Sequence, residues 1–361
     1  MPDLLKTPLH AEHLALGARM VEFAGWDMPV QYSGVIQEAK AVREAAGMFD
    51  VSHMGRTRHR GDSVVPFWDF LATNDIQKLT DGASTYSLLC YPDGGCVDDI
   101  IVYRIRQDEL YVVINAANRE KDIEWMRQHN DGGVEIVDET FESAMIAVQG
   151  PKAVEIVEAL ADAPVSQVER FHSATCDVAG VPAFLGRTGY TGEDGFEIIV
   201  PASQAAVVWK ALVDQGVTPC GLASRDVLRV EAGLPLYGHE LSPTINPIEA
   251  GLGWVCKKER DYVGKEAIDA MRASGPPRKL VGIQMLSRIV PREGYKVFRE
   301  GEEIGVVSSG VFSPLLDCGI AFAFIRSEHA TLDSDCEVEV RDKKHPARMV
   351  NKRFLQAAKG N

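Results

Sequence analysis

The spacing of apolar residues predicts two short helices near the start of the chain. Within residues 34–46, Val35, Ala39 and Val42 recur at helical spacing, and Gly47 follows as a stop signal. Residues 63–71 show the same amphipathic pattern. Both stretches are therefore expected to be helices with one buried face.

From residue 86 onward the pattern changes to that of strands. Apolar stretches at 87–90 and 99–104 flank the turn sequence of residues 92–95, Pro-Asp-Gly-Gly, which predicts a β-hairpin. A further apolar strand is predicted over 109–115. Residues 118–126 then predict a helix, with Asn118 as its N-cap.

A similar order of hairpin and helix recurs later in the chain. Strands predicted at 182–186 and 195–200 flank a glycine-rich turn, and a helix is predicted over 205–215. Two such units predict an α+β fold with two stacked subdomains and antiparallel sheets. The regular strand–helix alternation of a doubly wound fold is not seen in the sequence.

The last part of the chain has the pattern of a separate β domain. Residues 273–278, Ala-Ser-Gly-Pro-Pro-Arg, would interrupt any regular element and predict a linker. Short strands are predicted beyond it at 280–285, 295–298, 303–308, 320–325 and 336–341. This spacing is typical of a small barrel or sandwich. We therefore divide the chain into residues 1–275 and 276–361.

Charge and cysteine content narrow the possible functions. The formal net charge of -14 opposes loose binding to nucleic acid or to an anionic membrane. The seven cysteines are scattered without a C-x-x-C pair, which argues against a zinc site or a disulfide framework. The amino terminus does not resemble a leader peptide. We expect a cytoplasmic protein, with a mature mitochondrial form that has lost its leader left open.

The strongest local feature is the acidic pair Asp98-Asp99, which opens an apolar strand two residues after Gly94-Gly95. Side chains of neighbouring strand residues point to opposite faces, so one acid can reach a pocket while the other faces the turn or solvent. A carboxylate held at the edge of an apolar strand has a raised proton affinity and can exchange a proton with a ligand nitrogen. The alternative is that both acids simply solvate the mouth of the hairpin.

A second feature is the glycine-rich run from Arg187 to Glu197. Its glycines allow the backbone to approach a flat ligand, on which Tyr190 can stack. Glu197 can accept two parallel N–H donors, such as those on the edge of a pterin or a purine. The alternative is an ordinary glycine-rich hairpin with charged flanks. The run lacks the pattern of a phosphate-binding loop.

Other polar residues carry weaker signals. Arg225 lies on a predicted short helix and is a candidate clamp for a ligand carboxylate, although pairing with a neighbour is the commoner role of an arginine. His53 and His239 are isolated in sequence, and we predict structural roles for them and no metal site. Hydrolase and dinucleotide-binding motifs are not seen in the sequence.

Taken together, these segments resemble the aminomethyltransferase, or T-protein, of the glycine cleavage system, in order and nearly from end to end. The matching segments are residues 17–21, 23–29, 42–43, 47–55, 94–95 with 98–99, 115–118 with 120–122, 149–151, 187–197, 221–222 with 225–226, and 312–314. The chain departs from the usual pattern at Ala223-Ser224, at Ser308 and at Leu315-Leu316-Asp317. These departures bear on the carboxy-terminal part rather than on the candidate pocket.

The resemblance implies a fold and a reaction. It implies two intertwined antiparallel α+β subdomains that form a folate-binding region, with a C-terminal β-barrel, in a three-lobed, clover-like arrangement. The reaction is transfer of the aminomethyl carbon from the dihydrolipoyl arm of the lipoylated H-protein to tetrahydrofolate, giving 5,10-methylenetetrahydrofolate and ammonia. Tetrahydrofolate is then a co-substrate, and neither a metal nor a flavin is implied.

The resemblance also assigns roles to individual residues. Asp99 matches the family's essential aspartate beside the N5/N10 edge of folate, while Asp98 is expected to be a structural neighbour. Glu197 matches the acid that holds the amino edge of the pterin. The other positions that match the folate pocket are Met54, Tyr86, Asn115, Tyr190 and Arg225.

Two rival functions remain on the same fold. One is a folate-dependent demethylase acting on a sulfonium or methylamine donor, which the intact acidic pair disfavours. The other is a non-enzymatic, folate-binding assembly factor. Relatives of that kind depart from the acidic pair and from the run Arg187–Glu197, both of which are whole in this chain.

Overall fold

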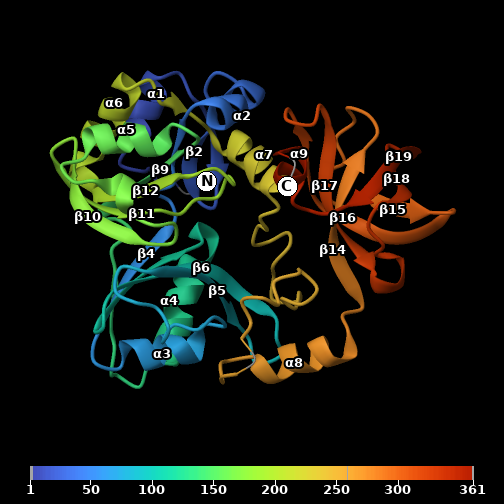
Figure 1. The fold of residues 1–361 in the computed structure, drawn as a ribbon, viewed down its shortest axis with the longest axis horizontal. Helices are drawn as coiled ribbons and strands as arrows, with labels where there is room; N and C mark the ends of the chain where they lie inside the picture. The colour runs from blue at the N-terminus through green and yellow to red at the C-terminus, as the bar shows by residue number, and fades with distance from the viewer. Residues whose placement is uncertain (1–2, 258, 360–361) are drawn as a thin grey trace. The chain divides into compact units, whose positions relative to one another are not determined.

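A computed structural model of the chain describes residues 3–257 and 259–359, and the side chains of residues 357 and 359 are left aside (Figure 1). The structure divides into two compact units. The first consists of residues 1–87 and 98–225, and the second of residues 88–97 and 226–361. Two elements carry the chain from one unit to the other, the hairpin around the Pro92–Gly95 turn and a helix that begins at Leu222. The predicted domain boundary at residue 275 stays a prediction.

The first unit contains a six-stranded sheet with the strand order β10-β11-β12-β9-β3-β13. The strands are β3 (Gly47–Asp50), β9 (Ser143–Gln149), β10 (Ser173–Val178), β11 (Val181–Gly186), β12 (Gly195–Pro201) and β13 (Thr218–Pro219). Every residue of β9 is buried. Helices α5 (Ala153–Leu160) and α6 (Ala205–Asp214) pack against the sheet, where Trp209, Phe196 and Ile146 share one apolar core.

A second sheet of this unit carries the acidic pair. Its order is β5-β6-β7-β4-β8. The strands are β4 (Gly55–Arg60), β5 (Ser84–Cys90), β6 (Cys96–Arg106), β7 (Glu109–Ile114) and β8 (Glu135–Asp138). Helices α3 (Val64–Leu71) and α4 (Arg119–Gln128) accompany it, and Trp68 of α3 makes an edge contact with His59 of β4. The connection from β7 to α4 is short and consists of Asn115 and the 3-10 turn over Ala116–Asn118.

The remaining regular elements of the first unit surround these sheets. They are α1 (His10–Ala15), the hairpin strands β1 (Arg19–Phe23) and β2 (Trp26–Gln31), α2 (Val35–Glu44), and the 3-10 turns η1 (Ala116–Asn118), η2 (Val165–Gln167) and η3 (Ala202–Gln204). Helix α1 is short, and its one fully buried polar side chain is His13. This residue anchors the helix to β3, because its Nε2 lies 2.8 Å from Asp50 Oδ2.

The second unit contains a closed barrel of six strands in the order β14-β17-β16-β15-β18-β19. The strands are β14 (Arg278–Met285), β15 (Lys296–Arg299), β16 (Glu302–Ser313), β17 (Cys318–Arg326), β18 (Ser334–Val340) and β19 (Lys343–Val350). Helices α7 (Leu222–Ala232), α8 (Lys265–Ser274) and α9 (Phe354–Lys359) and the turn η4 (Ser327–His329) complete its regular structure. Closure leaves the barrel without an exposed sheet edge.

The turn that joins β5 to β6 belongs to the second unit and depends on its two glycines. Gly94 has a φ of 85°, which favours a residue without a side chain. A Cβ atom on Gly95 would lie 1.8 Å from the carbonyl oxygen of Pro243. The fold of this turn therefore requires glycine at both positions, whether or not a ligand binds nearby.

The structure confirms the predicted α+β class and shows that the C-terminal domain is a barrel. The sheets are antiparallel as predicted, except that β13 pairs with β3 in parallel at the edge of the six-stranded sheet. One boundary was wrong, and several strands were missed. The predicted linker begins later, because Ala273 and Ser274 still belong to α8. Strands β1 to β4, β8 to β10, β13 and β19 were not predicted. Asn118 occupies the N-cap position of α4, but its side chain makes no capping hydrogen bond there.

Among the described residues, no helix is both long and apolar enough to cross a membrane.

Candidate functional site

Strand β6 and the residue after β7 bring the predicted Tyr86, Asp99 and Asn115 together. The Tyr86 hydroxyl donates to Asp99 Oδ2 at 3.1 Å, and Asn115 Nδ2 donates to Asp99 Oδ1 at 2.7 Å. Tyr86 lies on β5, so three neighbouring segments of one sheet supply the group. The Asp99 side chain is only partly exposed, in agreement with its place at the start of an apolar strand.

The environment of Asp99 changes its protonation. Burial, followed by repulsion from Asp98, raises the pKa of Asp99 from its ordinary 3.8 to about 7, against the hydrogen bonds from Tyr86 and Asn115. A carboxyl group with this pKa holds both protonation states near neutral pH. Such a group can accept a proton from a ligand nitrogen and return it.

Asp98 lies in a different position from the one expected for a neighbouring strand residue. It faces neither the turn nor solvent but is fully buried. Its Oδ2 accepts from the Asn115 backbone N–H at 2.9 Å, and its Oδ1 accepts from Asn115 Nδ2 at 2.9 Å and Asn118 Nδ2 at 2.6 Å. Asn115 therefore bridges both acids. The missing cap of α4 is explained, because the Asn118 side chain turns to Asp98 instead.

A second group forms around Glu197 on β12. Thr188 Oγ1 donates to Glu197 Oε2 at 2.6 Å and lies 2.5 Å from the Tyr103 hydroxyl. Tyr103 comes from β6, four residues after Asp99, so the strand presents both side chains on one face. Gly186 makes room for the tyrosine, since a Cβ atom there would lie 2.3 Å from the hydroxyl oxygen. Strand β6 thereby links the two carboxylates of the candidate site.

Arg225 and Tyr190 also meet, as a cation and an aromatic ring. The Arg225 guanidinium carbon lies 5.1 Å from the Tyr190 ring centroid and 5.6 Å from that of Phe49. Its Nη1 is buried and has no hydrogen-bond partner among the described residues. Burial lowers the pKa of Arg225, and the charge of Glu197 opposes this. An unsatisfied buried donor of this kind is suited to a ligand acceptor.

The glycine-rich run between β11 and β12 is held by its own side chains. Arg187 donates to Asp194 through Nε at 3.1 Å and Nη2 at 2.7 Å. Gln149 Nε2 donates to the Thr188 carbonyl at 3.1 Å, and a Cβ atom on Gly189 would lie 1.8 Å from Gln149 Oε1. Arg187 and Gln149 are structural residues, and they fix the loop that carries Thr188 and Tyr190.

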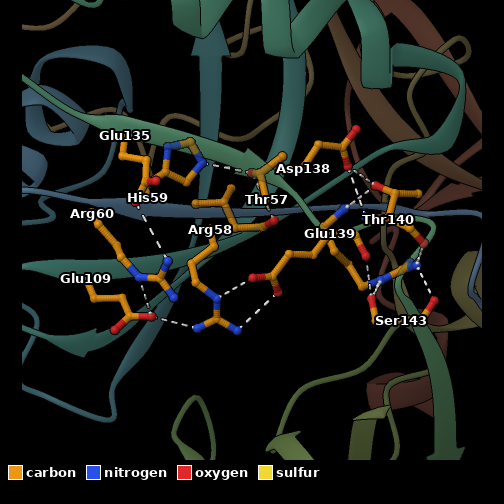
Figure 2. A network of polar contacts seen from close by, with 12 residues as sticks. Thr57, Arg58, His59, Arg60, Glu109, Glu135, Asp138, Glu139, Thr140 and Ser143 are labelled. Atoms are coloured by element: carbon orange, nitrogen blue, oxygen red, sulfur yellow. Dashed lines mark hydrogen bonds and ion pairs between the residues drawn. The ribbon is translucent and has the colours of Figure 1, made fainter. Parts of the chain in front are cut away.

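Met54 lies in the segment before β4, and its carbonyl is held by Arg56. The Arg56 guanidinium is buried and also donates to the Ser52 and Ser143 carbonyls, each at 3.0 Å, to Ser143 Oγ at 2.8 Å and to the Thr140 carbonyl. Figure 2 shows the same strand and loop, where Arg58 pairs with Glu139 at 2.6 Å and Glu109 at 2.7 Å. The Met54 segment is thus tied to the loop before β9.

His53 is a buried residue of the same segment. Burial lowers its pKa to about 4, and the charges of Arg225 and Arg56 act in the same direction while Asp50 opposes them. Its Nδ1 has no hydrogen-bond partner among the described residues. Among those residues, no cluster of three or more His, Cys, Asp or Glu is placed to hold a metal ion.

Sequence reasoning missed several residues that shape the site. Tyr103 was detectable, because it repeats the strand face of Asp99. Thr188 lies inside the recognised glycine-rich run but was not singled out. Arg56 carried no sequence signal, since its role depends on carbonyls that only the folded chain brings near.

Comparisons with known proteins cover nearly the whole chain. Residues 9–260 match the family model of the GCVT N-terminal domain, and residues 278–356 match that of the glycine cleavage T-protein C-terminal barrel domain. An aminomethyltransferase of Symbiobacterium thermophilum is 48% identical over 368 residues, which cover 98% of this chain and 98% of that protein. One from Geobacillus sp. (strain WCH70) is 45% identical and covers 99% of this chain and 100% of its own.

A solved structure agrees with these sequence relatives. The crystal structure of glycine cleavage system aminomethyltransferase T from Bartonella henselae matches with a TM-score of 0.93 at 32% sequence identity. The match covers 98% of this chain and 99% of that one. The chain therefore belongs to the aminomethyltransferase (T-protein) family of the glycine cleavage system.

Proposed function

We propose that the protein transfers the aminomethyl carbon from the dihydrolipoyl arm of a lipoylated H-protein to tetrahydrofolate, giving 5,10-methylenetetrahydrofolate and ammonia. The family membership supports the reaction class. The observation that carries the proposal is the Asp99 group, in which a partly exposed carboxyl with a pKa of about 7 is oriented by Tyr86 and Asn115. In this position it can hold a proton beside the folate N5/N10 edge.

The other residues would bind and orient the folate. Thr188 donates to Glu197 Oε2, and a carboxylate can accept more than one donor, so Glu197 could also accept the N–H donors of the pterin edge. Tyr190 offers a ring face, and Arg225 offers a buried donor. Met54 would line the same pocket. Asp99 and Tyr103 are four residues apart on β6, about 13 Å at the usual rise of a strand, which suits an extended ligand.

The reaction needs little beyond placement and one proton-exchanging group. The carbon leaves sulfur and nitrogen and forms two bonds to folate nitrogens, while the two protons released from those nitrogens end on the thiol and on ammonia. Holding the nitrogen nucleophile against the tethered carbon removes most of the entropic barrier. Asp99 would accept one of the released protons, and Tyr86 and Asn115 keep its oxygens aimed at the ligand.

The test is a reconstituted assay with tetrahydrofolate and H-protein that carries an aminomethyl-loaded lipoyl arm. We expect folate-dependent release of ammonia together with methylenetetrahydrofolate. Ammonia release at the rate of a no-enzyme control would overturn the proposal. Methyl transfer from a sulfonium or methylamine donor would favour the demethylase, and folate binding without any product would favour the assembly factor. The bacterial relatives support the further proposal that the reaction takes place in the cytoplasm.

A further inference from the structure

Asp122 is a buried carboxyl group that the proposed reaction does not use. It lies in the first turn of α4 and is fully buried. Neither of its oxygens receives a hydrogen bond from an N–H or hydroxyl group of the described residues. The Lys121 ammonium lies 3.8 Å from Asp122 Oδ1, at the limit of an ion pair. A charged carboxylate would be costly in such a place, so the group needs another form of compensation.

Among the charged groups that act on Asp122, Asp98 has the strongest effect, so it is the acceptor to which a proton held by Asp122 can be donated. Asp98 accepts three N–H donors from Asn115 and Asn118, and these favour its charged form. Asp122 has no such donors among the described residues. Of the two carboxyl groups, Asp122 therefore keeps the proton. Burial, and after it the charge of Asp98, raise the pKa of Asp122 to about 11.

We propose that Asp122 is a positioning residue, which stays protonated and donates a hydrogen bond to Asp98, so that Asp98 and Asn115 hold the Asp99 carboxyl in place. The contacts run from Asp122 to Asp98, from Asp98 to Asn115 and from Asn115 to Asp99. The charged or titratable groups that act on Asp122 are Asp98 and Asp99 from β6 and Lys121 from its own helix. The importance of Asp122 for turnover rests on the proposed function, but its proton and its effect on Asp99 do not.

Two substitutions at residue 122 distinguish the effect of its hydrogen bond to Asp98 from the effect of its side-chain volume. Asp122→Asn keeps the shape and supplies a permanent N–H donor to Asp98, whereas Asp122→Leu keeps a similar volume and supplies none. With Leu, Asp98 keeps its three N–H donors and its charge but loses the opposing O–H dipole. The potential at Asp99 then becomes more negative, and its pKa rises. Glu124→Leu, at an exposed acid on the same helix, is the matched control.

The first readout is the titration of aspartate carboxyl groups by carbon-13 NMR in the ligand-free protein, with Asp99 and Asp122 assigned by their Asn variants. In the unsubstituted protein we expect the Asp122 resonance to stay at its protonated position from pH 6 to pH 9. We expect the apparent pKa of Asp99 to rise by about one unit in Asp122→Leu and to change little in Asp122→Asn and Glu124→Leu. Titration of Asp122 within that range overturns the proposal even if the Leu variant does not fold.

The second readout is turnover, measured once the transfer assay is established. We expect kcat at pH 7 to fall about tenfold to a hundredfold in Asp122→Leu with little change in the KM for folate, and to be largely kept in Asp122→Asn. In an Asp98→Asn background, where the acceptor charge is absent, Asp122→Leu should have little further effect. Equal losses in the Asn and Leu variants, or additive losses in the double variant, overturn the proposal. Because the NMR titration uses no substrate, a failed transfer assay leaves that result standing.

Discussion

Asp50 and Asp99 are aspartates of the same structural unit with opposite proton affinities. Burial acts to raise the pKa of both. At Asp50 the hydrogen bond and charge of His13, together with hydrogen bonds from Ser52 and Thr7, reverse that effect and lower the pKa to about 2. At Asp99 burial and the charge of Asp98 prevail, and the pKa rises to about 7.

The difference lies in the neighbours rather than in the depth of burial. Asp50 is the more deeply buried, yet a histidine nitrogen lies 2.8 Å from its Oδ2, the Ser52 N–H donates at 2.9 Å, and the Thr7 hydroxyl donates at 2.6 Å. Asp99 has two neutral donors and a like charge beside it. A fully satisfied carboxylate stabilises a fold, whereas an incompletely satisfied one is available for proton exchange.

The largest expected effect follows from removing the titratable group of Asp99. Asp99→Asn keeps the shape and the contact with the Tyr86 hydroxyl, so folate binding should change little, while turnover falls on the order of 10²- to 10⁴-fold. The measurements are folate affinity by titration calorimetry and kcat in the transfer assay. Asp214→Asn, at an exposed acid that ends α6, is the control and should keep full activity. Full turnover by Asp99→Asn would remove Asp99 from the mechanism.

The corresponding change at Asp50 should affect stability instead. His13→Leu leaves the Asp50 charge buried without its main partner, and we expect a loss on the order of 3–5 kcal/mol in the free energy of unfolding. The control is His10→Gln on the same helix, where the pair with Asp27 at 2.7 Å is partly exposed and should contribute less than about 1 kcal/mol. Urea unfolding monitored by tryptophan fluorescence gives both values. Equal losses in the two variants would contradict the comparison.

The two acids should also give opposite dependences of stability on pH. The pKa of Asp50 is lowered on folding, so its stabilisation is present above its ordinary 3.8 and is lost as the pH falls toward 2. The pKa of Asp99 is raised, so the folded state favours its protonated form and loses stability as the pH rises from 3.8 to about 7. Each effect is on the order of 2 kcal/mol, with the Asp99 value reduced for partial exposure to solvent.

Denaturant unfolding of two Asn variants tests the direction in which each acid changes the stability as the pH rises. Relative to the unsubstituted protein, Asp99→Asn should gain stability between pH 4.5 and pH 8.5. Asp50→Asn should be destabilised at pH 5, and the difference should narrow toward pH 2.5. A stability difference for Asp99→Asn that does not change with pH would show that its carboxyl titrates normally.

Local sequence patterns predict some elements of this fold and miss others. The helices at residues 35–44 and 64–71 and the hairpin around Pro92–Gly95 follow from local periodicity and turn chemistry. Strand β9 was not predicted because its short apolar run, residues 144–148, cannot be distinguished by periodicity alone from a segment of a buried helix. The acidic pair was found from its position at the start of a strand and from the motif set around it.

What the sequence could not supply is the set of partners around each charge. Asp50 is bonded to a histidine 37 residues away, and Arg56 to a serine 87 residues away. Asn118 has the local sequence of a helix cap, but its side chain is committed to a carboxylate 20 residues earlier. Such pairings arise from the packing of elements that are distant in sequence, and no local pattern encodes them.

The smallest expected effects come from removing one neutral donor from each acid. Tyr86→Phe deletes the hydroxyl that lowers the pKa of Asp99, so this pKa should rise by up to about one unit, and the acid limb of the kcat profile should move to higher pH. Thr7→Val deletes the corresponding donor to Asp50, whose pKa starts near 2 and stays far below neutral after a similar rise. The Thr7 variant should therefore keep the pH profile of turnover and lose only about 1–2 kcal/mol of stability. A shifted profile in the Thr7 variant, or an unshifted one in Tyr86→Phe, would break the distinction between the acid that stabilises the fold and the acid that exchanges a proton.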